Sequence, residues 1–111
     1  MRVRDFVNET GMKVVAGEKG LDRELAGVYV CDLLSWVMSH ANKGDAWITV
    51  HTHMNIIAVA LLTEVSAIII PEGIAVEAAT INKANEEGIP ILCGEQSAYK
   101  ICCDAYNLLK G

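Results

Sequence analysis

The chain is poor in aromatic residues, with one Phe, two Trp and three Tyr, and it contains only two prolines among 111 residues. It also lacks positive charge, because nine Lys and Arg stand against fourteen Asp and Glu and no segment gathers basic residues. This excludes the electrostatic footprint of a nucleic-acid-binding protein. No apolar run reaches the ~20 residues that span a bilayer, and none follows the charged amino terminus as in a signal peptide. We therefore expect a cytoplasmic protein without a membrane segment.

Several chemical motifs are missing too. The four cysteines form no C-x-x-C pair, so we expect buried, reduced thiols (Cys31, Cys93, Cys102 and Cys103). There is no G-x-S-x-G elbow for a nucleophile, and neither phosphate-binding pattern, G-x-G-x-x-G or G-x-x-x-x-G-K-[ST], occurs. The sequence thus predicts no cofactor and no catalytic activity.

What is present is a hydrophobic content of 52%, enough for one domain over residues 1–111. Apolar periodicity and turn signals predict five short strands and five helices in near alternation. The expected strands cover residues 12–16, 28–30, 47–50, 67–70 and 91–93, and the expected helices cover residues 3–10, 33–41, 54–63, 74–87 and 98–109. From residue 28 onward each strand is followed by a helix. Right-handed crossovers then predict an α/β domain whose mostly parallel sheet is flanked by helices.

In a parallel sheet, ligands bind outside the carboxyl ends of the strands. Four loops of this chain follow strands, and their polar side chains are candidate ligand-binding residues: Asp32, His53, Asn55, Glu72 and Ser97. Helix capping is the competing interpretation for Asp32, Thr52, Asn55 and Ser97, and it needs no ligand.

His51 and His53 are separated by one residue, so an extended segment would point both imidazoles in the same direction, as metal chelation requires. Further ligands would have to come from Cys31, Asp32, His40 or Glu72. The alternative is that one ring bonds to loop backbone while the other faces solvent. We predict no metal site.

The predicted helix over residues 54–63 is apolar on every side. It must be covered on more than one side, either by a second copy of the chain or by a central position within the monomer. The first alternative predicts a homodimer or a higher homo-oligomer.

The segment Gly20-Leu-Asp-Arg-Glu-Leu-Ala-Gly27, with Asp32-Leu-Leu and the later Gly88-Ile-Pro-Ile-Leu, resembles the DRTGG domain family. That domain is similar to the amino-terminal domain of HPr kinase/phosphorylase. Asp22, Arg23 and Gly27 match the family signature, whereas Glu24 departs from it. The resemblance covers roughly residues 14–109 and implies a regulatory α/β module without a reaction of its own.

The resemblance extends to a free-standing, single-domain branch through residues 47–58, which implies a redox or hydrogenase-related protein partner. Independently of the family, Asp22 and Arg23 have opposite charges. They can pair with each other and fix the loop, or Arg23 can meet an anionic ligand.

Three functions follow. The first is a non-catalytic regulatory module that binds a small ligand, with nucleotides among the candidates, and signals to a partner protein. The second is a ligand-free oligomeric scaffold or interaction subunit. The third is a small metal-dependent hydrolase using His51 and His53.

Overall fold

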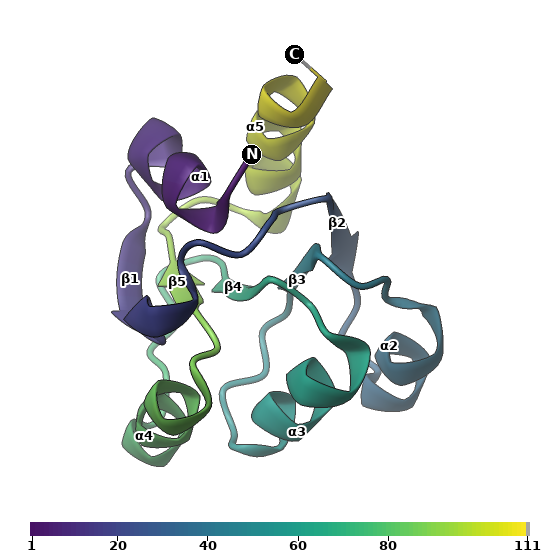
Figure 1. The fold of residues 1–111 in the computed structure, drawn as a ribbon, viewed down its shortest axis with the longest axis vertical. Coiled ribbons are helices and arrows are strands. Elements are labelled where there is room, and N and C mark those ends of the chain that lie inside the picture. The colour runs from purple at the N-terminus through teal and green to yellow at the C-terminus, as the bar shows by residue number, and fades with distance from the viewer. Residues whose placement is uncertain (111) are drawn as a thin grey trace.

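Five strands form one sheet in the order β1-β5-β4-β3-β2 (Figure 1). The computed structural model describes residues 1–110. Strands β2 to β5 run parallel in chain order, and β1 lies antiparallel to β5 at one edge. The strands are β1 (Lys13–Ala16), β2 (Gly27–Val30), β3 (Asp45–Ile48), β4 (Ala67–Ile70) and β5 (Ile91–Cys93). The predicted α/β domain with a mostly parallel sheet is confirmed.

Helices cover both faces of the sheet. The helices are α1 (Val3–Thr10), α2 (Leu34–His40), α3 (Asn55–Thr63), α4 (Ala78–Glu87) and α5 (Ala98–Lys110), with a 3₁₀ turn at Glu18–Gly20. Figure 1 shows α1 and α5 on one side of the strands and α2, α3 and α4 on the other. Among residues 1–110, no helix is long and apolar enough to cross a membrane.

The core has two parts, one on each face of the sheet, because alternate residues of a strand point to opposite faces. Trp47, Ile68 and Ile70 pack under α2, α3 and α4, whereas Ile48 and Ile69 pack under α1 and α5. All four residues of β4 are fully buried. A central parallel strand covered on both faces requires this continuous apolar run.

Two predicted boundaries, those of β3 and α4, and one predicted cap, that of α2, are wrong. The strand expected over residues 47–50 is β3 at Asp45–Ile48, because the Val50 N–H donates to the Asp32 carboxylate (3.0 Å) and leaves the sheet. Helix α2 has Leu33 at its N-cap position, and the Asp32 side chain does not cap it. Helix α4 begins at Ala78, four residues after the predicted start, because the chain after β4 passes through a turn with positive φ before it becomes helical.

Helix α3 lies between α2 and α4 and buries most of its surface within the monomer. Ile56, Ile57, Val59, Ala60 and Thr63 are buried, while Leu61 and Leu62 stay exposed. The central position of α3 therefore accounts for most of its apolar character, and this helix does not by itself require a second copy.

Candidate functional site

The carboxyl ends of β2, β3, β4 and β5 meet at one edge of the sheet, as the parallel register requires. The segments that leave this edge carry all five candidate residues: Asp32 after β2, His53 after β3 with Asn55 at the start of α3, Glu72 after β4 and Ser97 after β5. The structure brings these loops together in pairs rather than around one point.

The loops after β2 and β3 are joined by Asp32. Its Oδ1 accepts hydrogen bonds from the Thr49 hydroxyl (2.8 Å) and the Val50 amide (3.0 Å). The carbonyl of Asp32 also contacts Nε2 of His51. Asp32 thus holds two loops together, which is a structural role that leaves its second carboxylate oxygen for another partner.

The two histidines have separate partners. His51 bonds to the backbone of Asp32, and Nδ1 of His53 accepts the Asn55 amide (3.3 Å). The alternative to metal chelation predicted that one ring bonds to loop backbone, and in the structure both rings have a backbone partner. Over residues 1–110, no three His, Cys, Asp or Glu side chains gather closely enough to hold a metal ion. Thr52 and Asn55 do not cap α3 with their side chains, since α3 has Met54 at its N-cap and no side-chain cap.

The loops after β4 and β5 are tied by backbone hydrogen bonds. The Glu72 amide donates to the Gln96 carbonyl and the Gly73 amide to the Gly94 carbonyl, both at 2.9 Å. Glu72 and Gly73 both have positive φ, which costs energy for Glu72. Ser97 Oγ accepts the Lys100 amide (3.2 Å) at the start of α5, so its predicted capping role is confirmed.

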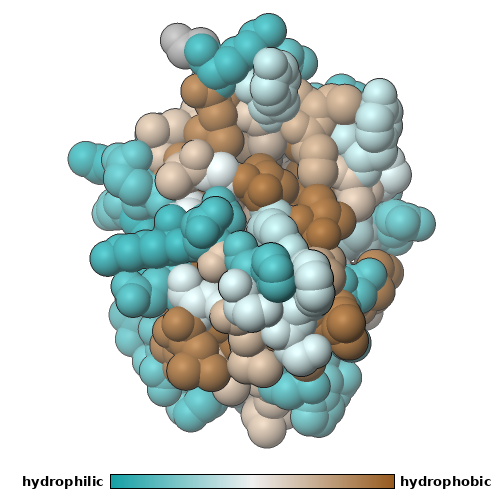
Figure 2. All heavy atoms as spheres, turned by 90° about the vertical axis from the view of Figure 1, so that its right-hand side faces the viewer, coloured by the Kyte–Doolittle hydropathy of each residue, from teal (hydrophilic) through white to brown (hydrophobic). Residues whose placement is uncertain are grey.

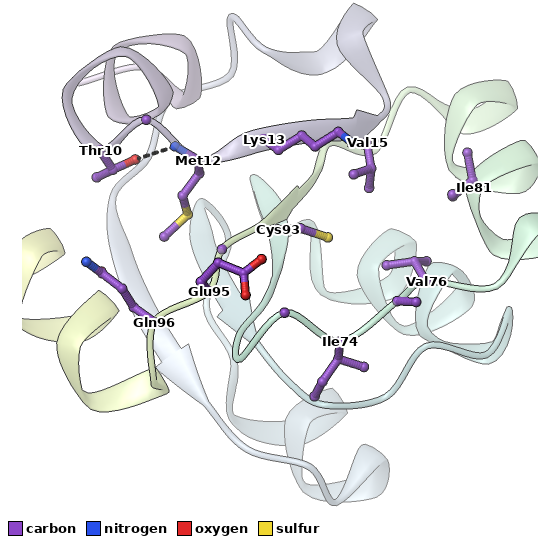
Figure 3. A pocket seen from close by; sticks show the side chains of 14 residues that line it. Thr10, Met12, Lys13, Val15, Ile74, Val76, Ile81, Cys93, Glu95 and Gln96 are labelled. Carbon is purple, nitrogen blue, oxygen red and sulfur yellow. Dashed lines mark hydrogen bonds between the residues drawn. The ribbon is translucent and has the colours of Figure 1, made fainter.

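A cavity of about 470 Å³ lies between these two loops and the start of β1 (Figure 3). Because β1 is antiparallel to β5, Lys13 pairs with Cys93 and brings the amino end of β1 to the carboxyl edge. The lining residues come from four segments of the chain: Thr10–Lys13 and Val15, Gly73–Val76, Ile81, and Cys93–Gln96. This volume is within the ~300–1,000 Å³ of ligand pockets.

The cavity combines an apolar wall with a charged rim. Val15, Val76 and Ile81 form part of the wall, whereas Lys13 and Glu95 are exposed and carry opposite charges. Figure 3 shows the Glu95 carboxylate turned toward the cavity. A Cβ on Gly73 would lie 2.5 Å from Oε2 of Glu95, so glycine makes room for this carboxylate.

Cys93 lies on the wall of the same cavity. Burial raises the pKa of its thiol, and the charge of Lys13 opposes this shift. A thiol with a raised pKa is protonated at neutral pH and is a poor nucleophile. The lining contains no histidine to act as its base. The arrangement is therefore suited to binding a small molecule by apolar contact and polar recognition.

Sequence reasoning selected the edge of the sheet at which this cavity lies, but it did not select Lys13, Glu95 and Gln96 of the lining. Glu95 and Gln96 directly precede the predicted residue Ser97, and their place in a strand-to-helix loop was the available signal. Lys13 could not be found in this way, because its position depends on β1 being antiparallel and adjacent to β5.

The family-signature residues lie at the opposite end of the strands, at and before the amino end of β2. Gly27 begins β2, and a Cβ there would lie 2.9 Å from Oδ1 of the buried Asp45. Asp22 does not pair with Arg23 as predicted. Its carboxylate instead contacts Nε of Arg4 (3.0 Å), because the backbone of this segment is bonded to the start of α1. Arg23 donates to the Val65 carbonyl (3.4 Å).

This ion pair gives a titration prediction. The hydrogen bond and the charge of Arg4 lower the pKa of Asp22. A lowered pKa in the folded state stabilises the protein above the unfolded pKa, and this stabilisation is lost as the pH falls through the folded value. The contribution is small because Asp22 is exposed.

We expect NMR titration to find the pKa of Asp22 below that of an ordinary aspartate. The substitution Arg4→Met should raise it toward the ordinary value, while Arg23→Met should leave it unchanged. A shift caused by Arg23→Met, with none from Arg4→Met, would contradict the observed pairing.

The fold is similar to a solved regulatory structure. It matches the CBS and DRTGG domains of the regulatory region of Clostridium perfringens pyrophosphatase, a structure complexed with the activator diadenosine tetraphosphate, with a TM-score of 0.67 and 14% identity. The match covers 90% of this chain and 44% of that chain, so the present chain spans less than half of its structural neighbour. No curated protein sequence matches this chain significantly. The DRTGG domain model matches residues 5–104, nearly the whole chain. The chain belongs to the DRTGG domain family.

Proposed function

We propose that this protein is a non-catalytic regulatory module that binds a small molecule in the cavity beside β5 and signals to a partner protein. The observation that supports this most is the cavity itself, since it lies at the carboxyl edge, where open α/β sheets bind ligands. The regulatory setting of the DRTGG domain in the structural neighbour supports the same role.

Nucleotides are the first ligand class to test. The structural neighbour is complexed with a dinucleotide activator, and it also includes CBS domains, while the present chain matches 44% of it. The cavity offers the contacts that a nucleotide needs: an apolar wall for the base, the Glu95 carboxylate to accept an exocyclic amine, and the Lys13 ammonium to meet a phosphate.

The partner remains the one that the resemblance implies, a redox or hydrogenase-related protein. Asp32, His53, Asn55, Glu72 and Ser97 stay in the proposal as residues of the same edge. Glu72 and Ser97 belong to the two loops that border the cavity, and each is next to a lining residue, Gly73 and Gln96 respectively.

The test is thermal-shift and calorimetric titration of the protein with AMP, ADP, ATP and diadenosine tetraphosphate, followed by a wider metabolite panel. We expect at least one compound to raise the Tm in a concentration-dependent way, since ligand bound only to the folded state stabilises it. Glu95→Gln should weaken its binding about tenfold, the loss of ~1.4 kcal/mol that a charge-assisted hydrogen bond supplies.

Glu86→Gln is the matched control. Glu86 is an exposed glutamate on α4 that pairs with Lys83 outside the cavity, so its substitution removes one negative charge without changing the lining. Equal loss of affinity in both variants would indicate a general charge effect. A panel that leaves the Tm unchanged at millimolar concentration contradicts the proposed ligand site.

A further inference from the structure

The two outermost strands of the sheet, β1 and β2, differ in how they are protected from pairing with another chain. Edge strand β1 carries the exposed Lys13, and its register with β5 shifts between Val14 and Ala16, which indicates a bulge. A lysine and a bulge are the devices that keep an edge strand from pairing with another chain. The other edge strand, β2, has the sequence Gly-Val-Tyr-Val, with no charge, proline or register shift.

The outer side of β2 has free backbone groups. Within residues 1–110, β2 pairs only with β3. The amide of Ala26 donates to the Gly44 carbonyl (2.9 Å) just before the paired strands. Alternate residues of a strand bond to the same neighbour, so Gly27 and Tyr29 direct their N–H and C=O groups outward. Another strand can therefore continue the sheet at this edge.

Apolar surface flanks this edge. On one side a groove of about 490 Å³ separates β2 from α5, and its lining is Gly27, Val28, Val30, Cys102, Tyr106, Leu109 and Lys110. Val30 is 50% exposed and Tyr106 is 68% exposed, which is unusual for a strand and helix that contact each other. Figure 2 faces this side of the molecule and shows hydrophobic side chains gathered in its middle, with hydrophilic residues around them.

We propose that a second copy of this chain occupies the β2 edge, with the two β2 strands antiparallel across a two-fold axis. Such pairing would join two five-stranded sheets into one and place Val30 and Tyr106 of each copy in the interface. A two-fold contact uses the same surface on both partners, and β2 provides both the donors and the acceptors that this requires.

The charges at the two ends of β2 fit a second copy as the occupant. The chain has a formal net charge of −5, which opposes self-association in general, so copies are expected to meet where the surface is uncharged or carries complementary charges. Lys110 is the one charged residue in the groove lining. Helix α5 starts at the carboxyl edge and runs back across the sheet, so Lys110 lies toward Gly27, whereas Asp32 follows the other end of β2. Antiparallel pairing brings Lys110 of each copy toward the Asp32 end of the other.

The experiment is sedimentation velocity over a concentration series of the full chain. We expect a species of twice the 12.0 kDa chain mass. Val30→Lys should weaken the dimer about thirtyfold or more, because a lysine in this interface would be desolvated. Tyr106→Glu, on the other wall of the groove, should act in the same direction.

Leu62→Lys is the matched control. Leu62 is 72% exposed on α3, away from β2, so this variant places the same new charge on another apolar surface. It should leave the dimer intact. Circular dichroism establishes that each variant is folded, and Tyr106→Glu provides the test if Val30→Lys is not. A monomer at all concentrations, or a dimer that Leu62→Lys dissociates and the β2-edge variants do not, overturns the proposal.

Discussion

Gly17→Ala is expected to lower the free energy of unfolding by more than ~4 kcal/mol, or to prevent folding. Gly17 follows β1 with a φ of 73°, and a Cβ there would lie 1.9 Å from the carbonyl oxygen of Ile89. Its amide donates to Oδ1 of Asn85 on α4 (2.8 Å). The obstacle is backbone and cannot rotate away, so the turn after β1 would have to separate from the segment before β5.

Gly11→Ala separates the steric effect from the backbone conformation. Gly11 ends α1 with nearly the same φ, 72°, but a Cβ there would have no heavy atom within 4 Å. Its substitution should therefore cost only the ~1–2 kcal/mol of a left-handed alanine. Urea unfolding followed by circular dichroism measures both variants. Equal losses would show that the close approach of Gly17 to Ile89 does not matter.

Trp47→Ala is expected to cost about 3–5 kcal/mol, a large fraction of the ~5–15 kcal/mol that holds a domain of this size together. Trp47 lies in β3 with no exposed surface. Its indole N–H donates to the Cys31 carbonyl (2.9 Å) and so joins β3 to the end of β2. Alanine would leave a large void and an unpaired carbonyl. Trp47→Phe would fill much of the void but still lose this hydrogen bond, so its loss should be smaller.

The chain contains one other tryptophan, which serves as the control. Trp36 is 51% exposed on α2 and stacks on His40 with ring centroids 3.9 Å apart. Trp36→Ala removes this stacking and the buried half of the side chain, so its loss should be clearly smaller than that of Trp47→Ala. In Trp36→Phe the fluorescence of Trp47 is the sole indole signal, so chemical unfolding can be followed from the core. A Trp36→Ala loss as large as that of Trp47→Ala would contradict the assigned burial.

Local patterns predicted most of the fold because each strand and helix has a clear signal at its own position. Gly88 and Pro90 mark the end of α4, and Ser97 marks the start of α5. The end of β3 and the cap of α2 were predicted wrongly because a tertiary hydrogen bond replaced a local one. Asp32 has a residue type typical of helix caps, yet its carboxylate accepts from Thr49 and Val50 of the neighbouring loop.

The candidate site was predictable to the edge of the sheet and no further. The rule that parallel strands gather their carboxyl ends applies to any such chain, so it selects loops rather than atoms. Which side chains line a cavity depends on strand order, and the placement of β1 beside β5 has no local signal in the sequence. The Asp22–Arg23 hypothesis failed for the same reason, because Arg4 reaches Asp22 only after α1 has docked.

Strands β2 to β5 are neighbours in the sheet in chain order. Strand β1 instead pairs with β5, which lies near the far end of the sequence. Closing so long a loop is a slow, entropically costly part of building such a sheet. The cavity spans this junction, with Met12 and Lys13 on one side and Cys93 and Glu95 on the other. A molecule bound there would contact both sides of this junction and so stabilise the pairing of the amino-terminal sixteen residues with the rest of the domain. Its binding would then slow the hydrogen exchange of the β1 amides.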